Sequence, residues 1–585
     1  MSFFDDASLA FLPSGAAGKD GKAYSIKPTD GTGDFTFSRG SNLSATRVGA
    51  DGLIEKGREN LLLQSNQFDT IWTLNTTSVT SGQSGYDGSS DAWLLNSTGT
   101  GFPRIQQNVS TSGVFVFSVY AKAATDGFML LRTSGANSQV WFDLSDGSIS
   151  NSTGSEYISS TTEDVGNGWY RYSILANGSL TNVRIYPASA YGVYSTSGNG
   201  IYIQDSQVEV GTLATEVIES GATTGKAGLL EDEPRFDYSG DCPSLLLEPS
   251  RTNSVAQSEY LNGISWAGKI GVSFDTNTTT SPEGLGNSAL LKEDSSNGSH
   301  FAYKDFALTN GSTYTISIFA KSNGTNRNLR FGDGGLGWSS GFNGYFDLTD
   351  GTATGGDIES MGNGWYRCSV TGTTNATTSR LIVYSTLGTA SSYQGDGSSG
   401  VFLYGFQIEQ GSYPTSYIPN HSGGTITRGA DFPTTTISTD ITDSTQGSVY
   451  FEFQSIADNN ELALSYFTLN TSTTDNIRFG LTASGSEIYF RAKKDSVDLF
   501  SYTSNITNPT AVNKMAFRWG LNDWKLYLNG NPIYTNTSMA TFESGDLTKL
   551  ESDINGGAYK FLGNVKQLLV FSTKLTDNEL QTLTT

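Results

Sequence analysis

The chain contains one pattern twice, about 200 residues apart, and this internal repeat limits the folds that are open to it. The two copies keep the same order of segments, while the loops between the segments differ in length. A domain has therefore been duplicated within one chain. The segments recur at offsets of 196, 204 and 200 residues: 166–171 and 362–367 (GNGWYR in both), 142–147 and 346–351 (FDLSDG and FDLTDG), and 207–211 and 407–411 (QVEVG and QIEQG).

Strand signals dominate both copies and the region that follows them. Apolar residues alternate with polar ones at Tyr314, Ile316 and Ile318, as expected of a half-buried antiparallel strand. Asn-Gly and Asp-Gly pairs follow many such runs and favour tight hairpins. The sequence predicts an all-β fold of serial β-sandwich or jelly-roll domains, with one short terminal helix over 576–583 that Thr576 or Asp577 would cap.

The repeat and the segments around it divide the chain into five parts. We expect a lead segment, two related jelly rolls, a linker between them, and a third sandwich of a different kind. A chain of 585 residues is long enough to give each sandwich its own core. The expected boundaries are 1–57 for the lead segment, 58–220 for the first jelly roll, 221–250 for the linker, 251–431 for the second jelly roll, and 432–585 for the third sandwich.

Charge and hydropathy exclude several classes of partner. The net charge of −22 would repel nucleic-acid backbones and anionic membrane surfaces. No run of 18 apolar residues is present, so we expect no membrane insertion, and the first residues do not resemble a signal peptide. We therefore expect neither a nucleic-acid partner nor a membrane anchor.

Few residues suit catalysis. The only histidines are His300 and His421, and we expect both at the surface, so we predict that the chain is not an enzyme. Glycoside hydrolysis needs two carboxylates that flank one bond. The nearest candidates are Glu452 and the Glu551-Ser552-Asp553 fragment, which keep a polysaccharide depolymerase open as an alternative.

Two sets of residues are candidates for ligand binding. The repeated strand that closes each copy carries Gln207 and Glu209, and Gln407 and Glu409, on one face; the alternative is a hydrogen-bonding pair that closes the sheet. The Gly-rich loop 332–342 carries Trp338 and Phe342, whose rings could stack on a sugar or fold onto the sheet. We expect no cofactor, with structural calcium as the sharper alternative.

The third sandwich resembles the concanavalin A-like, laminin-G-type lectin fold. The resemblance covers about 150 residues and follows the order of a strand, a hairpin that ends in Leu-Asn-Gly, a closing strand and a short helix. This fold hosts lectins, enzymes and spacers alike, so it implies an architecture rather than a ligand. The segments that carry the resemblance are 514–520 (KMAFRWG), 524–530 (WKLYLNG), 561–565 (FLGNV) and 568–571 (LLVF).

The chain as a whole resembles bacteriophage virion proteins of the tail-fibre, tail-spike or head-fibre type. The resemblance implies carbohydrate-binding-module jelly rolls, attachment to other virion proteins through the lead segment, host-surface glycans as ligands, and a homo-oligomer, by analogy a trimer, on the particle surface. A purely structural decoration protein is a further alternative. The segments that carry the resemblance are 52–55 (GLIE), 234–238 (PRFDY), 246–253 (LLEPSRTN), 407–409 (QIE), 414–419 (PTSYIP) and 427–431 (TRGAD).

Overall fold

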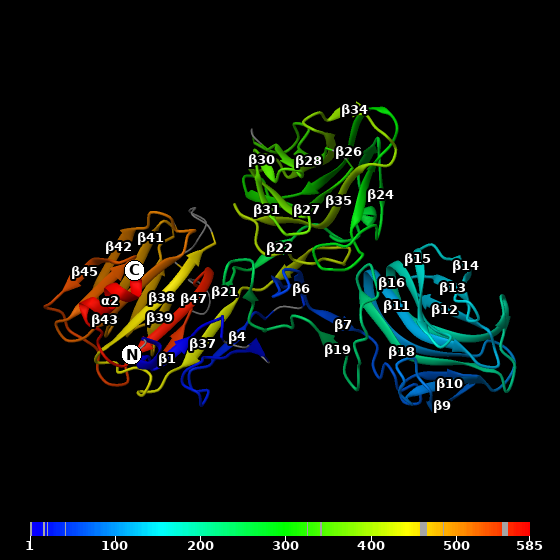
Figure 1. The fold of residues 1–585 in the computed structure, drawn as a ribbon, viewed down its shortest axis with the longest axis horizontal. Helices are drawn as coiled ribbons and strands as arrows, with labels where there is room; N and C mark the ends of the chain where they lie inside the picture. Colours follow the sequence, from blue (N-terminus) through cyan, green and yellow to red (C-terminus); the bar gives the residue numbers. More distant parts are fainter. Residues whose placement is uncertain are drawn as a thin grey trace.

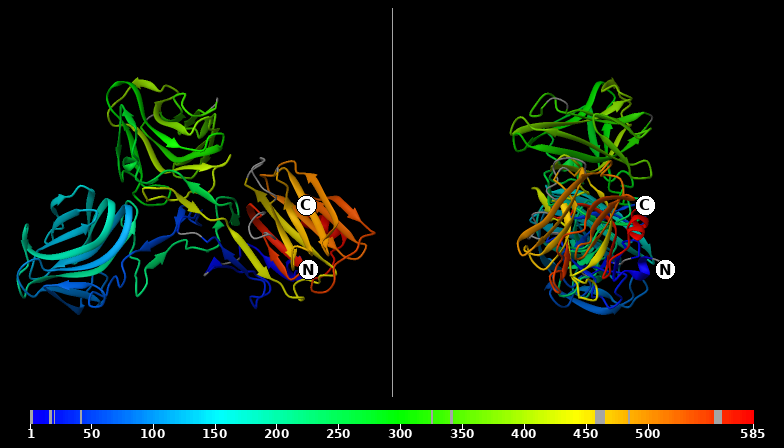
Figure 2. Two further views of the ribbon diagram at one scale, coloured as in Figure 1. Left: turned by 180° about the vertical axis from the view of Figure 1, so that it is seen from behind. Right: turned by 90° about the vertical axis from the view of Figure 1, so that its left-hand side faces the viewer.

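The computed structural model consists of three β-rich lobes that are connected near the centre of the molecule (Figure 1). Seen from behind, the three lobes again stand apart from one another (Figure 2). The fold is all-β, as the sequence predicts. The structure describes residues 3–15, 18–19, 21–40, 43–324, 326–339, 342–456, 465–483, 485–552 and 560–585.

The first copy of the repeat is a jelly roll in which two long strands run through both layers. The strand order is β14-β13-β12-β16-β11-β18-β10-β9, and β15, β17 and β8 pair at the sides. The strands are β8 (Thr73–Asn75), β9 (Thr77–Gln83), β10 (Ala92–Ser97), β11 (Arg104–Ala123), β12 (Phe128–Ser134), β13 (Ser138–Asp143), β14 (Ile149–Thr153), β15 (Tyr157–Gly166), β16 (Trp169–Ala190), β17 (Val193–Tyr194) and β18 (Gly200–Val210).

The second copy has the same architecture in two separate sheets. Their orders are β23-β26-β33-β28-β29-β30, with β34 on β26, and β24-β25-β35-β27-β32-β31. A short 3-10 helix spans Leu261–Gly263. The strands are β23 (Gly268–Ile270), β24 (Val272–Asp275), β25 (Ala289–Glu293), β26 (Asn297–Ala307), β27 (Thr313–Asn323), β28 (Arg327–Gly332), β29 (Gly344–Asp347), β30 (Thr352–Thr354), β31 (Asp357–Ser360), β32 (Tyr366–Thr373), β33 (Thr378–Leu387), β34 (Ser392–Gln394) and β35 (Gly400–Gln410).

One difference between the copies explains the different number of sheets. In the first copy β11 passes from one layer to the other through a register shift between Asn108 and Thr111. In the second copy the equivalent stretch is broken into β26 and β27, with Gly311 at a φ of 75° in the turn between them. The register shift bends β11 and leaves it continuous, whereas the turn at Gly311 separates β26 from β27.

The third lobe is a sandwich of two large sheets. One has the order β20-β21-β47-β38-β43-β44-β45 with β1 on β47, and the other has the order β2-β3-β4-β37-β46-β39-β40-β41-β42. The strands of residues 432–585 are β37 (Phe432–Thr436), β38 (Gly447–Ser455), β39 (Ser465–Asn470), β40 (Asn476–Leu481), β41 (Glu487–Lys494), β42 (Val497–Asn505), β43 (Asn513–Trp519), β44 (Trp524–Leu528), β45 (Asn531–Asn536), β46 (Lys549–Glu551) and β47 (Gly563–Phe571).

The remaining strands of this sandwich come from the lead segment and the linker, which corrects the expected division of the chain. Residues 1–57 and 221–250 were expected to stand apart from the third sandwich. Their contributions begin with the short helix α1 (Phe3–Asp6), which precedes β1 in the same lobe. The strands are β1 (Leu9–Phe11), β2 (Gly18–Lys19), β3 (Lys22–Ala23), β4 (Phe35–Ser38), β20 (Phe236–Asp237) and β21 (Ser244–Leu247).

These short strands are integral to the third core. Leu9 pairs with Val570 on β47, and Phe37 pairs with Pro433 on β37. Phe35 and Phe37 are both 2 % exposed and belong to the same apolar cluster as the strands of residues 432–585. The lead segment is therefore part of a folded lobe and not a free peptide.

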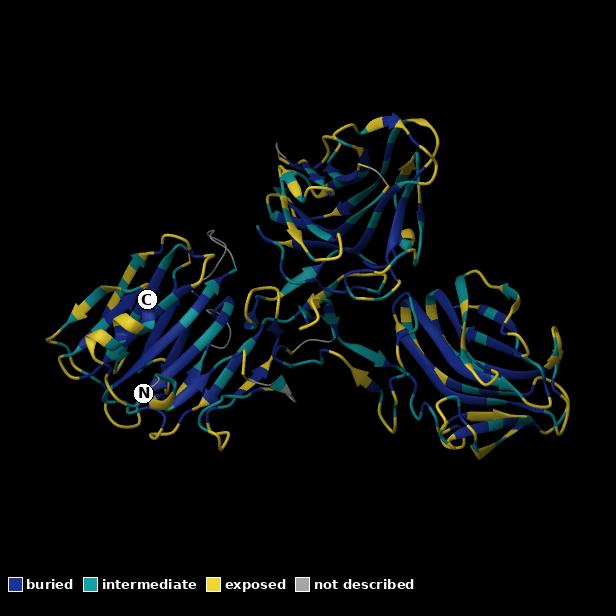
Figure 3. Cartoon of the chain, in the orientation of Figure 1, coloured by how far each residue is buried: buried dark blue, intermediate teal, exposed yellow. Residues whose placement is uncertain are grey.

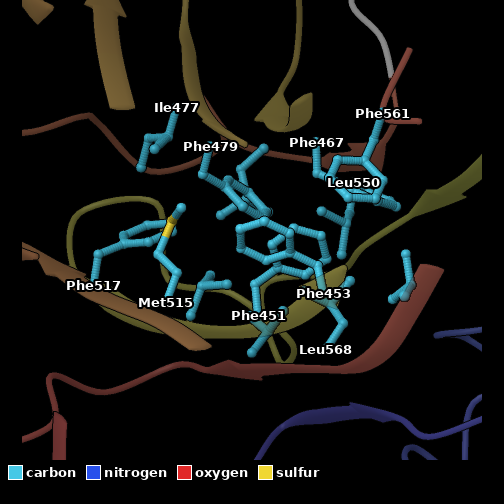
Figure 4. Packing of buried hydrophobic residues seen from close by; sticks show 14 of the residues in the cluster. Phe451, Phe453, Phe467, Ile477, Phe479, Met515, Phe517, Leu550, Phe561 and Leu568 are labelled. Carbon is cyan, nitrogen blue, oxygen red and sulfur yellow. The ribbon is translucent and has the colours of Figure 1, made fainter. Parts of the chain in front are cut away.

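Packed aromatic rings fill the interior of the third sandwich. Phe451 and Phe453 lie on β38 with their ring centroids 4.8 Å apart, and Phe467 and Phe479 approach Phe451 from the other sheet (Figure 4). In all three lobes buried residues follow the strands and exposed residues gather at the loops (Figure 3). Burial of this kind is the main source of stability in a β-sandwich.

The terminal helix is α2 (Asp577–Thr584), and Thr576 caps it, as one of the two sequence alternatives predicts. The Thr576 hydroxyl accepts the backbone N–H of Glu579, and the Glu579 carboxylate accepts the backbone N–H of Thr576. This reciprocal pair satisfies two N–H groups that the first turn of a helix leaves open. It fixes where the helix begins.

Short two-stranded ribbons connect the lobes. Each jelly roll is closed at its base by a pair of strands from its two ends, and a hairpin lies between these pairs. The ribbons are β5 (Thr46–Val48) with β6 (Ile54–Lys56), β7 (Arg58–Asn60) with β19 (Gly225–Ala227), and β22 (Arg251–Asn253) with β36 (Ile426–Arg428).

A buried ionic cluster lies where the lead segment, the linker and β36 meet. It consists of Arg39, Arg235, Glu248, Arg428 and Asp431, and we call it the joint. Arg235 donates to Glu248 over 2.6 Å and also contacts Asp431, while Arg428 lies 2.9 Å from Glu248 and Arg39 lies 3.3 Å from Asp431. The joint therefore ties the lead segment, the linker and the end of the second jelly roll to one another.

Candidate functional site

The two rings of the Gly-rich loop do not form the exposed platform that a sugar-stacking role would need. Trp338 is 6 % exposed and Phe342 is 1 % exposed, and their rings stack 4.1 Å apart within the core of the second copy. The Trp338 indole N–H donates to the Arg380 carbonyl over 2.8 Å. Burying both rings while satisfying the indole N–H is more favourable than leaving them in water, so these residues stabilise the fold.

The repeated glutamine and glutamate of the second copy hold its closing loop. Glu409 is fully buried and accepts hydrogen bonds from the Thr415 backbone N–H over 2.8 Å and from the Thr415 hydroxyl over 2.6 Å. Gln407 donates to Glu409 over 2.6 Å and accepts the Ile418 N–H over 2.7 Å. Both side chains are therefore engaged with the chain itself.

The first copy repeats this arrangement. Glu209 accepts the Thr215 N–H over 3.0 Å and also contacts the Thr215 hydroxyl, and Gln207 accepts the Ile218 N–H over 2.7 Å. Gln207 and Glu209 are 1 % and 2 % exposed. In both copies the geometry matches the sheet-closing alternative, in which a buried polar side chain is retained because its partners are satisfied.

The carboxylates named for a depolymerase lie on opposite sides of the third sandwich. Glu452 follows the core residue Phe451 on β38, and Glu551 follows the core residue Leu550 on β46, which belongs to the other sheet. Because side chains alternate along a strand, each carboxylate points away from the shared core. This pair cannot flank one glycosidic bond, and Asp553 lies outside the described residues.

Both histidines are covered, which corrects the expectation that they lie at the surface. His300 is completely buried, with Nδ1 2.8 Å from the Gly271 carbonyl oxygen. The His421 side chain is 12 % exposed and its Nε2 atom lies 3.8 Å from Glu259. Burial lowers the pKa of His421 to about 4, although the nearby Glu259 opposes the shift.

The first jelly roll carries an arginine row across the outer face of one layer. Arg132 on β12 pairs in register with Arg184 on β16, Gln139 on β13 lies beyond Arg132, and Gln106 on β11 lies beyond Arg184. We call these four residues the arginine row. Residues in direct register on one face have Cβ atoms about 5 Å apart, so the two guanidinium groups share one patch of surface.

Strand alternation directs the arginine row away from the core. The neighbours Leu131, Val183 and Ile185 are completely buried in the apolar cluster of the first copy. Residues between them must therefore point outward. On the other layer of this lobe, Val116 and Leu175 pack with Tyr260 of the second copy. The arginine row lies on the face that the second copy leaves free.

The positive charges of the arginine row are not compensated. Within the described residues neither Arg132 nor Arg184 makes an ion pair, and Arg184 Nε is enclosed without a hydrogen-bond partner. The Oδ1 atom of Asn182, two residues away on the same face, is also enclosed and without a partner. Two like charges in register destabilise a sheet, and enclosed polar atoms without partners add to that cost.

Aromatic rings stand beside the arginine row. The β17 hairpin folds back so that the Tyr194 ring lies 5.6 Å from Trp141 and 5.7 Å from Tyr186. Tyr191 lies 5.7 Å from Trp141 and is 52 % exposed, and Phe102 lies 5.0 Å from Tyr194 and is 61 % exposed. We call these five residues the aromatic wall. Its outer rings are available to a ligand.

The second copy keeps the aromatic positions and lacks the arginine pair. Phe142 pairs with Met129 and Phe346 with Leu329, which aligns the two faces through the repeated FDL segment. In this alignment Trp141 corresponds to Tyr345, Tyr186 to Tyr384, Arg132 to Gly332 and Arg184 to Ile382. The duplicated face is aromatic in both copies and strongly positive only in the first.

An arginine does lie on the face of the second copy, but it already has partners. Arg330 donates to Ser391 and to Asn343, each over 3.2 Å, and lies over the Tyr384 ring at 5.2 Å. Arg380, at the edge of this face, forms a two-pronged pair with Asp305 at 2.7 and 2.9 Å. This face therefore serves as an internal comparison for the arginine row.

A hollow of about 430 Å³ lies beside the joint, away from both outer faces. Its lining includes Glu248, which is bound within the joint, and Arg367, which donates to the Ser317 hydroxyl over 3.1 Å. Within the described residues, no group of three or more acidic, histidine or cysteine side chains is placed to hold a metal. The same residues include no helix long and apolar enough to cross a membrane.

Comparison with known proteins gives weak structural similarities alone. No family model matches the sequence, and no curated protein matches it. Among solved structures, the sialidase CBM40 of Ruminococcus gnavus bound to sialyllactose aligns at 19% identity and a TM-score of 0.21, over 24% of this chain and 85% of that one. The tandem CBM22 domains of Paenibacillus barcinonensis Xyn10C align at 13% identity and a TM-score of 0.20, over 64% and 100%.

A third similarity involves a laminin. The LG4-5 domains of the mouse laminin alpha1 chain align at 10% identity and a TM-score of 0.17, over 53% of this chain and 96% of that one. Similarities this low carry no functional argument, so the function must be argued from the geometry of the chain.

The sequence contains a weak indication of the arginine row. Arg132 and Arg184 each follow an inward apolar residue on a strand, in Leu131-Arg132 and Val183-Arg184. An isolated arginine in such a position is predicted to be an ordinary solvent-exposed residue. Only the strand register brings two of them together, and register between segments 50 residues apart is not visible in one sequence.

Proposed function

We propose that this chain is a bacteriophage virion surface protein of the fibre or spike type, which displays glycan-binding β-sandwich modules for adsorption to a host. One observation carries the glycan-binding part: aromatic side chains occupy equivalent register positions on the outer sheet face of both jelly rolls, where they are half-buried in the second copy and covered by exposed aromatic rings in the first. Trp141 and Tyr186 in the first copy correspond to Tyr345 and Tyr384 in the second.

The physical chemistry of this face suits carbohydrate. An aromatic ring packs on the C–H face of a pyranose, and amide and guanidinium groups bind its hydroxyls. The first copy supplies both elements, because the exposed rings of Tyr191 and Phe102 stand beside Gln106 and Gln139. The recurring rings Trp141 and Tyr186 are 7 % and 3 % exposed and form the covered base of the aromatic wall, so a ligand of the first copy would contact the outer rings Tyr191 and Phe102.

The virion assignment rests on the resemblance and on where its segments lie. Arg235 belongs to the segment 234–238, Glu248 to 246–253, and Arg428 and Asp431 to 427–431, and all four belong to the joint. The segments that carry the resemblance thus include the residues that join the lobes. Attachment to the particle, a trimeric state and binding without turnover belong to the same proposal.

A glycan array probed with the intact chain tests the glycan-binding part. We expect binding to at least one class of surface polysaccharide, and a loss of tenfold or more in the Tyr191→Ala and Tyr384→Ala double variant. Leu521→Ala is the matched control, because Leu521 is 66 % exposed on the third lobe, away from both faces. Absence of binding to every glycan would refute this part.

Two further measurements test the virion part. Labelled antibodies against the chain should decorate intact particles in electron micrographs, and light scattering should give the mass of three chains. Unlabelled particles or a monomer would contradict the respective statement. Release of reducing sugar from a bound polysaccharide would favour the depolymerase alternative instead.

A further inference from the structure

We propose that the arginine row of the first jelly roll binds the carboxylate of an acidic sugar within a polysaccharide. This inference rests on the proposed function and assigns a ligand class to one of its two faces. The site consists of Arg132 and Arg184 as the charged floor, Gln106 and Gln139 at its two ends, and the aromatic wall beside it.

The charge of the site is the first argument. The chain carries a net charge of −22, yet two arginines lie in register here and no described carboxylate pairs with either of them. On the equivalent face of the second copy the arginines do have partners, as Arg380 has in Asp305 and Arg330 in Ser391 and Asn343. Like charges in register are unfavourable in the empty state, and an anion bound between them removes that repulsion.

The unsatisfied atoms are the second argument. Arg132 and Arg184 are both partly exposed, and within the described residues neither guanidinium group donates a hydrogen bond. A carboxylate accepts two parallel N–H bonds from a guanidinium group, and a neighbouring sugar hydroxyl can donate to an amide oxygen. A carboxylated sugar supplies both kinds of group within one ring.

The aromatic wall is the third argument, because it distinguishes a sugar acid from a simple anion. Tyr191 and Phe102 are the exposed rings of the wall, and Arg104 lies 5.9 Å from the Tyr186 ring at its base. A phosphate or sulfate ion has no apolar face to place against such rings, whereas a pyranose does. Nucleic acid carries both rings and charge, so single-stranded DNA is one of the competing ligands in the test below.

The equivalent outer face of the second copy lacks the two arginines that would bind a carboxylate. Gly332 and Ile382 occupy the positions of Arg132 and Arg184, and the aromatic positions remain. We therefore expect the second face to bind neutral sugars in preference to acidic ones. The duplication has given one chain two related faces with different charge.

The test uses the intact chain and matched probes in isothermal titration calorimetry. The probes are oligogalacturonate against its carboxyl-reduced form, and sialyllactose against lactose. We expect at least one acidic probe to bind at least tenfold more tightly than its neutral counterpart. The Arg132→Gln and Arg184→Gln variants should each lose that preference. Arg491→Gln, which changes an arginine of the third lobe, should change affinity less than twofold.

Thermal unfolding separates a binding role from a structural one. Removing one of two like charges in register should leave the unfolding temperature of the Arg184→Gln chain unchanged or slightly raised. Loss of the preference in a chain that is no less stable therefore supports the site. A lower unfolding temperature together with unchanged binding would overturn it.

The outcomes distinguish this inference from the proposed function. Binding of neutral sugars with no preference for either acidic probe overturns the acidic-sugar site and leaves glycan binding intact. Binding of no sugar at all refutes both. A different result would be that the chain binds a sulfated oligosaccharide or single-stranded DNA as tightly as the best acidic probe, with the same dependence on Arg184. That result also overturns the assignment to a carboxylated sugar.

Discussion

Replacing Asp431 by asparagine should weaken the joint more than any exposed ion pair could. Asp431 accepts hydrogen bonds from Arg39 over 3.3 Å and from the Glu248 backbone N–H over 2.9 Å, and it also contacts Arg235. The side chains of Asp431, Arg39 and Arg235 are all fully buried. Asparagine has almost the same shape, so the change removes a charge and turns one accepting oxygen into an NH2 group that faces an N–H donor.

The expected magnitude follows from the charges that remain. The joint holds three arginines and two carboxylates, and Asp431→Asn leaves three arginines facing Glu248 alone. Breaking a buried ion pair by removing one partner costs about 3–5 kcal/mol. Arg235→Met should cost less, because it leaves two arginines facing two carboxylates. Asp498→Asn is the exposed control, with a half-exposed carboxylate beside Arg491, and should cost less than about 1 kcal/mol.

Hydrogen exchange resolved by mass spectrometry measures this effect where it occurs. Peptides that contain β4, β21, β36 and β37 meet at or beside the joint, so their amides report its opening. A cost of about 3–5 kcal/mol corresponds to a rise in the open population of roughly 150- to 5,000-fold. The charge argument is refuted if the amides of these peptides are equally protected from exchange in the Asp431→Asn and Asp498→Asn chains. It is also refuted if they exchange faster in Arg235→Met than in Asp431→Asn.

Two further predictions concern individual lobes. Burial raises the pKa of Asp205 to about 6, against the opposing hydrogen bond from Tyr86, so the native first jelly roll binds this proton more readily than the unfolded chain does. The stability of this lobe should therefore fall as pH rises from about 4 through 6. Asp205→Asn should remove that part of the pH dependence, so the stability gained over the parent chain should grow from pH 4 to pH 7 and reach about 3 kcal/mol at most. An equal gain in thermal stability at pH 4 and pH 7 would contradict this. Deleting residues 1–38 should unfold or aggregate the third lobe and leave the two jelly rolls intact, because Phe11, Phe35 and Phe37 are part of its core; a deleted chain whose Trp519 and Trp524 fluorescence stays native would contradict this.

The sequence was sufficient for the fold class and the duplication, because both depend on local patterns. Asn529 and Gly530 adopt φ values of 47° and 81°, which is the hairpin geometry that an Asn-Gly pair predicts. The capping of α2 by Thr576 is equally local. In each case the residues that determine the structure are neighbours in the chain.

The division into lobes and the candidate site could not be predicted from local sequence patterns. β1 and β20 are only three and two residues long, too short for a periodic signal. The partner of β1 is β47, at the far end of the chain, and β20 joins the same sheet only through its neighbour β21, which also pairs with β47. Trp338 was open to two interpretations because a Gly-rich loop does not say which way a ring will turn. Such outcomes depend on long-range packing, which no local pattern encodes.

The pairing of β1 with β47 also has a consequence for the order in which the protein is completed. Ser8 donates to the Val570 carbonyl across a separation of 562 residues. During synthesis β1 leaves the ribosome with its apolar residues, such as Phe11, long before β47 exists, and both jelly rolls are made in between. Closing so long a loop is slow, and waiting strand edges are prone to aggregate. The third lobe can therefore close only after both jelly rolls have been made, and chaperones should be needed most by β1 and the strands beside it.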